Sequence, residues 1–185
     1  MSRNEIALQL ITQCRQQYHD SRLSLQPCEP ADVLGDGRIW IGSMFDAVNT
    51  EWLRLKGITH VLNCAHQVAS YAKRVTGCTY IREILVLEAD DKEDYMILDK
   101  HLDDVVRFCD AAFRDSDSKI LFHCMAGVNR SATLALAYAA QIGLESRIEN
   151  LADAFVRVMR QRPIILTNGS FYNQLLIWAQ LCNYG

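Results

Sequence analysis

Lys119 to Gly143 read KILFHCMAGVNRSATLALAYAAQIG, and this stretch decides the fold. Residues 119–123 form a short apolar run that predicts a buried strand ending at a loop. The residues after Arg130 are apolar on nearly every face, which predicts a central buried helix. A loop between a strand end and a helix N-terminus aims backbone N–H groups and the positive end of the helix dipole at one point. The stretch therefore predicts an α/β fold with an anion-binding loop at residues 124–130.

Strands alternate with helices along the rest of the chain. We expect strands at residues 38–41, 59–64, 79–87 and 119–123, and helices at 4–18, 45–55, 96–113, 131–143, 151–160 and from 168 or 170 onwards. Such alternation predicts an α/β fold: a single domain with a central, mostly parallel sheet of four to five strands flanked by helices. Residues 1–30 form an N-terminal helix and connecting loop, and residues 31–185 form the domain itself. The N-terminal helix has one apolar stripe, which suits either packing on the domain or a homodimer.

Composition places the chain among ordinary soluble globular proteins. It has 185 residues, 50% of them apolar or aromatic, and a formal net charge of −3, which excludes a broadly basic nucleic-acid-binding protein. Its seven cysteines include no C-x-x-C pair, so neither a disulfide framework nor a zinc ribbon is indicated. No signal peptide and no apolar run of about 18 residues is present. We therefore expect reduced thiols, a cytoplasmic or nuclear location, and neither a nucleic acid nor a membrane as partner.

The loop after residue 123 carries the residues for phosphate chemistry. Gly127 lies in mid-loop, where a positive φ would turn successive amides inward. Arg130 follows Cys124 by six positions, and its planar guanidinium matches two oxygens of a tetrahedral phosphate. The same positive environment lowers the pKa of a cysteine and favours its nucleophilic thiolate.

The pattern His123-Cys124-x-x-Gly127-x-x-Arg130-Ser131 resembles the signature of the cysteine-dependent protein tyrosine phosphatases. The run RSATLALAY is similar to the small dual-specificity subgroup, Asn129 is similar to poxvirus-type members of the family, and the resemblance extends over about residues 30–182. It implies a protein phosphatase that hydrolyses phosphotyrosine and phosphoserine or phosphothreonine through a phosphocysteine, without metal or cofactor. It also implies the individual roles: Cys124 as nucleophile, Arg130 as phosphate clamp, Ser131 as donor to the leaving sulfur, His123 as loop support, and Met125, Ala126, Gly127, Val128 and Asn129 as the substrate-binding loop.

A general acid must protonate the leaving oxygen, and the resemblance implies an aspartate in the acidic segment EADDKED at residues 88–94. The spacing to the first apolar residue of the next helix favours Asp91, six positions before Ile97. If the later residues of that helix are matched to the family pattern instead, the position of the acid shifts by one residue. Asp90 therefore stays an alternative.

The resemblance leaves other phosphatase functions open. Asn129 stands where many dual-specificity enzymes have Ser, and RNA 5′-triphosphatases share this feature. Those enzymes usually continue with Arg-Thr-Gly and lack the acid, whereas this chain has Arg130-Ser131-Ala132. Phosphoinositide phosphatases usually carry lysine inside the loop, which this chain lacks. A phosphorylated protein is therefore the favoured substrate; another phosphate ester is second, and a catalytically silent phosphate-binding module is third.

Two further hypotheses concern residues outside the loop. Cys64 ends the strand at 59–64, which we expect beside the strand that ends at Cys124. Cys64 is either a packing residue or a thiol that traps oxidised Cys124 as a disulfide. Substrate specificity would come from residues 66–74 and the acidic segment.

Overall fold

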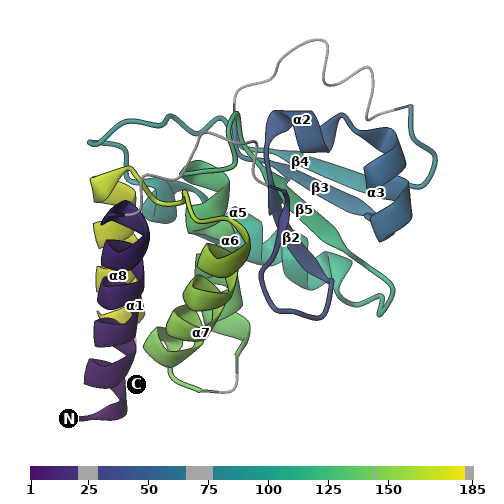
Figure 1. The fold of residues 1–185 in the computed structure, drawn as a ribbon. Helices are drawn as coiled ribbons and strands as arrows, with labels where there is room; N and C mark the ends of the chain where they lie inside the picture. Colours follow the sequence, from purple (N-terminus) through teal and green to yellow (C-terminus); the bar gives the residue numbers. More distant parts are fainter. Residues whose placement is uncertain (21–28, 66–76, 144, 182–185) are drawn as a thin grey trace.

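A computed structural model describes residues 1–20, 29–65, 77–143 and 145–181 of the protein (Figure 1). Within them the sheet has five strands in the order β1-β2-β5-β3-β4. Only β1 runs antiparallel to its neighbour, β2, and the other pairs are parallel. The predicted α/β fold with a mostly parallel sheet is therefore confirmed. The strands are β1 (Ala31–Asp32), β2 (Ile39–Gly42), β3 (His60–Asn63), β4 (Glu83–Val86) and β5 (Ile120–His123).

Helices cover both faces of this sheet (Figure 1). Successive side chains of a strand point to opposite faces, so β5 contributes to two separate cores. Leu121 packs with α2 and α3 residues in a small cluster, whereas Ile120 and Phe122 join the main core around α6. The helices are α1 (Arg3–Asp20), α2 (Met44–Ala47), α3 (Thr50–Lys56), α5 (Ile97–Ala112), α6 (Arg130–Ile142), α7 (Arg147–Gln161) and α8 (Gly169–Leu181).

The prediction of one helix over residues 45–55 is wrong, because the segment forms two short helices. A capping box between Ser43 and Asp46 starts α2. The Asn49 side chain then accepts a hydrogen bond from the backbone N–H of Trp52 at 3.0 Å and begins α3. Gly57 ends α3 in the left-handed conformation, with φ +70°. The strand predicted at 79–87 is also shorter, since β4 covers only Glu83–Val86.

Helix α1 packs on α7 of the same chain. Ala7 and Ile11 are buried in the main core. Arg15 donates a hydrogen bond from Nη2 to the carbonyl of Leu166 at 3.2 Å, and its guanidinium lies 3.7 Å from the Tyr172 ring centroid. No helix in the described part of the chain is long and apolar enough to cross a membrane.

Candidate active site

The loop predicted to bind phosphate lies where β5 ends and α6 begins. His123 pairs in register with Gly42 of β2 and Asn63 of β3, so the loop starts at the carboxyl edge of the sheet, between two neighbouring strands. Gly127 has φ +69°, and a Cβ atom there would lie 2.4 Å from the Gly42 carbonyl oxygen. Only glycine fits this position, because both the backbone conformation and the close approach exclude a side chain.

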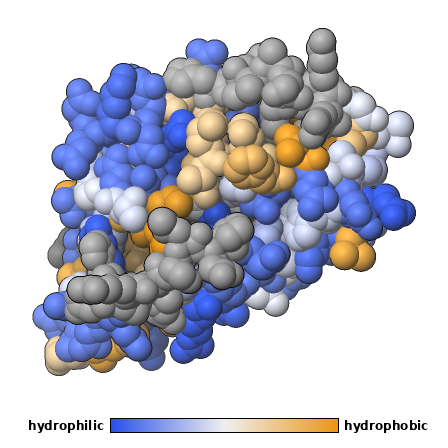
Figure 2. Space-filling model, turned by 45° about the horizontal axis from the view of Figure 1, so that its top comes forward, coloured by the Kyte–Doolittle hydropathy of each residue, from blue (hydrophilic) through white to orange (hydrophobic). Residues whose placement is uncertain are grey.

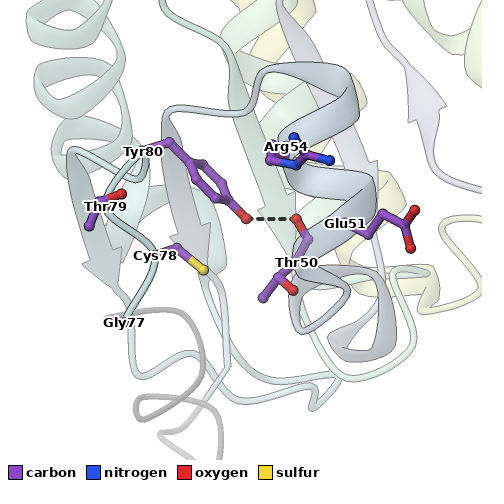
Figure 3. A pocket seen from close by; sticks show the side chains of 7 residues that line it. All are labelled: Thr50, Glu51, Arg54, Gly77, Cys78, Thr79 and Tyr80. Carbon is purple, nitrogen blue, oxygen red and sulfur yellow. Dashed lines mark hydrogen bonds between the residues drawn. The ribbon is translucent and has the colours of Figure 1, made fainter.

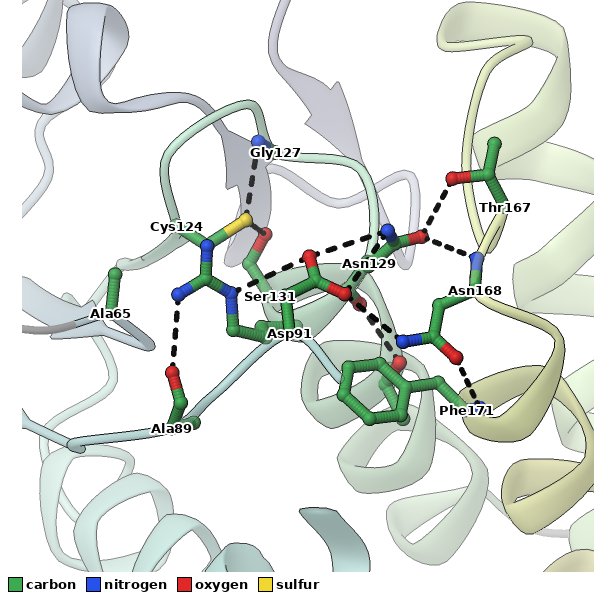
Figure 4. A network of polar contacts seen from close by, with 12 residues as sticks. Ala65, Ala89, Asp91, Cys124, Gly127, Asn129, Ser131, Thr167, Asn168 and Phe171 are labelled. Atoms are coloured by element: carbon green, nitrogen blue, oxygen red, sulfur yellow. Dashed lines mark hydrogen bonds and ion pairs between the residues drawn. The ribbon is translucent and has the colours of Figure 1, made fainter. Parts of the chain in front are cut away.

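Cys124 lies buried at the base of this loop and receives hydrogen bonds on its sulfur. The Gly127 amide donates to Sγ at 3.3 Å, and the Ser131 hydroxyl donates to it at 3.4 Å (Figure 4). Burial by itself raises the pKa of the Cys124 thiol. Hydrogen bonds from the Ser131 side chain and backbone, the charge of Arg130 and the Gly127 amide lower it by more, so the net pKa lies below its ordinary value. The site therefore shifts the equilibrium of Cys124 toward the thiolate.

Arg130 is the first residue of α6, its side chain is buried, and its charge acts on the Cys124 thiol. Its Nη1 donates to the Ala89 carbonyl at 3.1 Å, which ties it to the segment after β4. Its Nε is buried and donates no hydrogen bond within the described residues, although the Asp91 carboxylate lies 3.6 Å away. The Arg130 guanidinium therefore has one N–H group without a hydrogen-bond acceptor among the described residues.

Asp91 lies over this site and is held by two amide side chains. The Asn129 Nδ2 donates to both carboxylate oxygens at 3.3 Å, and the Asn168 Nδ2 donates to Oδ1 at 3.1 Å (Figure 4). Asp90, the alternative acid, instead pairs with Lys92 at 2.8 Å in an exposed contact. Of the two aspartates, the described contacts link Asp91 to Arg130 and the loop.

The two amides are themselves oriented by further hydrogen bonds. The Asn129 side-chain oxygen accepts from the Thr167 hydroxyl at 3.1 Å and from the backbone N–H of Asn168 at 3.0 Å. The Asn168 side-chain oxygen accepts from the backbone N–H groups of Ser170 and Phe171 at 3.1 and 3.3 Å, so it caps α8. Each amide oxygen is therefore occupied, which leaves the Nδ2 groups to face Asp91.

Arg162 is a residue of the site that the sequence did not indicate. It is buried, and it donates from Nε to the Gly127 carbonyl at 2.9 Å and from Nη2 to the Ala126 carbonyl at 2.7 Å. A third bond runs from Nη1 to the Glu29 carbonyl at 2.9 Å. By engaging the carbonyl groups from behind, Arg162 fixes the loop with its amides turned inward. An arginine 32 positions after Arg130 gives no local signal of this role.

His123 and Cys64 lie beneath the loop. Burial lowers the pKa of His123 to about 4, and its Nδ1 lies 3.4 Å from the Cys124 carbonyl oxygen. A neutral imidazole packed in the core suits structural support. Cys64 follows the residue paired with His123, and its amide donates to the His123 carbonyl at 2.7 Å. Its thiol is fully buried, and burial raises its pKa well above the ordinary value.

The remaining residues of the loop are more exposed than Cys124 and Arg130. Met125 and Ala126 are exposed, and Val128 and Asn129 are half-buried. The amide of Met44 in α2 donates to the Met125 carbonyl at 3.1 Å, while the amide of Leu166 donates to the Val128 carbonyl at 2.9 Å. Residues 66–74, which we expected to contribute to specificity, lie outside the described residues.

Comparison with known proteins identifies the family. The model of the dual specificity phosphatase catalytic domain matches residues 39–181. The chain belongs to the dual specificity phosphatase family. Human dual specificity protein phosphatase 8 is 32% identical over 157 residues, which cover 82% of this chain and 23% of that protein. The chain spans 12–33% of the length of the curated relatives reported for it.

Solved dual specificity phosphatases share the fold. The crystal structure of human DUSP28 has a TM-score of 0.68 and 25% identity, covering 86% of this chain and 98% of that one. The Yvh1 phosphatase domain from Chaetomium thermophilum has a TM-score of 0.64 and 27% identity, covering 85% of this chain and 99% of that one. Helix α1 lies outside the residues that the family model matches.

A pocket of about 560 Å³ lies elsewhere, between α3 and the segment before β4 (Figure 3). The Tyr80 hydroxyl crosses it to donate to the Thr50 carbonyl at 2.6 Å. None of the predicted site residues lines it; its lining residues are Thr50, Glu51, Arg54, Gly77, Cys78, Thr79 and Tyr80. Within the described ranges, no group of three His, Cys, Asp or Glu side chains is placed to hold a metal ion.

Proposed function

We propose that this dual specificity phosphatase hydrolyses phosphotyrosine and phosphoserine or phosphothreonine in proteins through a phosphocysteine on Cys124. The observation that carries the proposal is the buried Cys124 sulfur, which accepts hydrogen bonds from the Gly127 amide and the Ser131 hydroxyl and interacts with the charge of Arg130, while Asp91 lies 3.6 Å from the Arg130 Nε. A thiolate, a fixed cation and a carboxyl group are the parts that phosphoryl transfer to sulfur requires.

In the first step the Cys124 thiolate attacks phosphorus, a P–S bond forms, and the P–O bond to the substrate side chain breaks. The loop amides and Arg130 stabilise the charge on the equatorial oxygens. Asp91, protonated in this step, gives its proton to the leaving oxygen.

In the second step water attacks the phosphocysteine. Asp91, now a carboxylate, takes a proton from the water as the P–S bond breaks, and inorganic phosphate forms. The Ser131 hydroxyl donates to the departing sulfur, the bond already present at 3.4 Å. The thiolate is thereby regenerated without metal or cofactor.

Turnover of three substrates side by side tests the proposal: a phosphotyrosine peptide, a phosphothreonine peptide and a 5′-triphosphate RNA. We expect both peptides to be hydrolysed by the wild type and neither by Cys124→Ser, which should still bind them. Turnover of the RNA alone would assign the second function class. Peptide binding without turnover by the wild type would assign the silent module.

Two features of the whole protein are part of the same proposal. A cytoplasmic or nuclear location fits an enzyme whose nucleophile is a free thiol. The oligomeric state is monomer or α1-mediated homodimer: Ala7 and Ile11 are buried in the main core, while Ile6 and Leu10 remain exposed on α1. Sedimentation velocity of the wild type and of Leu10→Glu distinguishes the two, since only a dimer through α1 would dissociate in the variant.

A further inference from the structure

The mouth of the site has two chemically different sides. Asp91 and the acidic segment border one side. On the other side α2 and the loop expose two large apolar residues, Phe45 at 74% and Met125 at 46% of their surface. Figure 2 shows apolar residues gathered on one face of the molecule, with hydrophilic residues beside them. The two residues belong to segments joined by a backbone hydrogen bond, and exposed apolar side chains close to a functional site can serve as a binding surface.

Hydrogen bonds fix these apolar residues relative to the nucleophile. Met125 directly follows Cys124, and its carbonyl accepts from the Met44 amide at 3.1 Å, so Phe45 is the next residue after a direct contact with the loop. The capping box holds α2 rigid, because the Asp46 carboxylate accepts from both the amide and the hydroxyl of Ser43 at 2.6 and 2.7 Å. The backbone of Phe45 is therefore held at a set position beside the loop.

The charge of this side restricts what can bind there. Residues 43–49 and 125–129 contain no Lys or Arg, and Asp46 adds a negative charge. A ligand that continues with further phosphates, such as an RNA 5′ end or a polyphosphorylated lipid headgroup, would need cations at this place. A peptide with an apolar side chain needs none, and it gains free energy by covering exposed apolar surface.

We propose that Phe45 and Met125 form an apolar rim that selects phosphopeptides with a large apolar residue adjacent to the phosphorylated one. This inference rests on the proposed function, since the phosphoryl group must occupy the Cys124 loop for its neighbour to reach the rim. It names a substrate class, and it assigns Phe45 as a specificity-determining residue outside the signature loop.

The test compares two pairs of phosphotyrosine peptides that differ only by Leu or Ser, at the position before or after phosphotyrosine. Covering part of one apolar side chain should give the wild type about a tenfold higher kcat/KM for the Leu peptide in at least one pair. Phe45→Ser should reduce the ratio of kcat/KM for the Leu peptide over the Ser peptide to about twofold or less, because only the contact with Met125 would still cover the Leu side chain. The matched control is Leu55→Ser, at an α3 residue 79% exposed, which should keep the full ratio.

Equal kcat/KM within both pairs in the wild type, or an unchanged ratio in Phe45→Ser, would overturn the inference. Faster turnover of a 5′-triphosphate RNA than of the Leu peptides would overturn it as well. Failure of the proposed function has a different signature, because no peptide of either pair would then be hydrolysed. Binding of the same peptides to Cys124→Ser by fluorescence polarisation still tests the rim in that case: equal affinities for Leu and Ser would contradict it.

Discussion

Asn168→Ser should release Asp91 from one of its two amide donors while leaving α8 capped. The Asn168 side chain donates to Asp91 at 3.1 Å and accepts from the amides of Ser170 and Phe171. Serine is an equally strong N-cap residue, so the cap survives and only the donor to the carboxylate is lost. The variant therefore isolates the positioning of the acid from the folding of α8.

The magnitude follows from the single bond removed. Asp91 is protonated when it acts as the acid, and a hydrogen bond from the Asn168 amide to the neutral carboxyl group contributes about 0.5–1.5 kcal/mol. Asp91 keeps its bonds from Asn129, so the loss of orientation is roughly 1 kcal/mol. Since about 1.4 kcal/mol corresponds to a factor of ten in rate, kcat for a phosphotyrosine peptide should fall about fivefold.

The assay is steady-state turnover of a phosphotyrosine peptide and of p-nitrophenyl phosphate by wild type, Asn168→Ser, Asp91→Asn and the double variant. The loss should be smaller with p-nitrophenyl phosphate, because its leaving group is a stronger acid than tyrosine and depends less on protonation. In the Asp91→Asn background the second substitution should cost almost nothing. An additive loss in the double variant would contradict a role through Asp91, because Asn168 would then act on the fold rather than on the acid.

Three other perturbations test the remaining contacts of the site. Ser131→Ala should raise the pKa of Cys124, because it removes a hydrogen bond that favours the thiolate. The rise of kcat/KM with pH, and the rise of the rate of iodoacetamide alkylation with pH, should therefore both shift to higher pH. Unshifted pH profiles would contradict this role of Ser131. Arg162→Met should lower the melting temperature and kcat together. About 1.5–3 kcal/mol of unfolding free energy should be lost for each carbonyl left without its charged donor. Wild-type turnover in a less stable variant would show that the loop conformation does not depend on Arg162. Peroxide should form a disulfide between Cys64 and Cys124, which peptide mapping detects, and this disulfide should protect the activity from irreversible loss. Irreversible inactivation at equal rates in the wild type and in Cys64→Ser would leave Cys64 as a packing residue.

The strand–loop–helix unit could be predicted from the sequence because all its determinants are local. An apolar strand, a loop with Gly127 and a helix that is apolar on nearly every face occur in one stretch from Lys119 to Gly143. The alternation of strands and helices similarly predicts a mostly parallel sheet. The break between α2 and α3 was missed, because the Asn49 cap competes with an otherwise continuous helical pattern.

Contacts between distant segments could not be predicted in the same way. The spacing of the acidic segment favours Asp91 but keeps Asp90 as an alternative, and the contacts that support Asp91 come from the distant residues Arg130, Asn129 and Asn168. The role of Arg162 depends on where the chain turns after α7, which no periodicity encodes. A buried arginine is also rare enough that composition alone argues against it.

Chemical trapping of the intermediate tests whether Cys124 carries the phosphoryl group. The wild type is mixed with a phosphotyrosine peptide, quenched in acid within one turnover, digested and mapped by mass spectrometry. We predict phosphate on the peptide that contains Cys124, and none on that peptide in Cys124→Ser. Steady turnover with no phosphate on Cys124, or turnover that persists in Cys124→Ser, would contradict it.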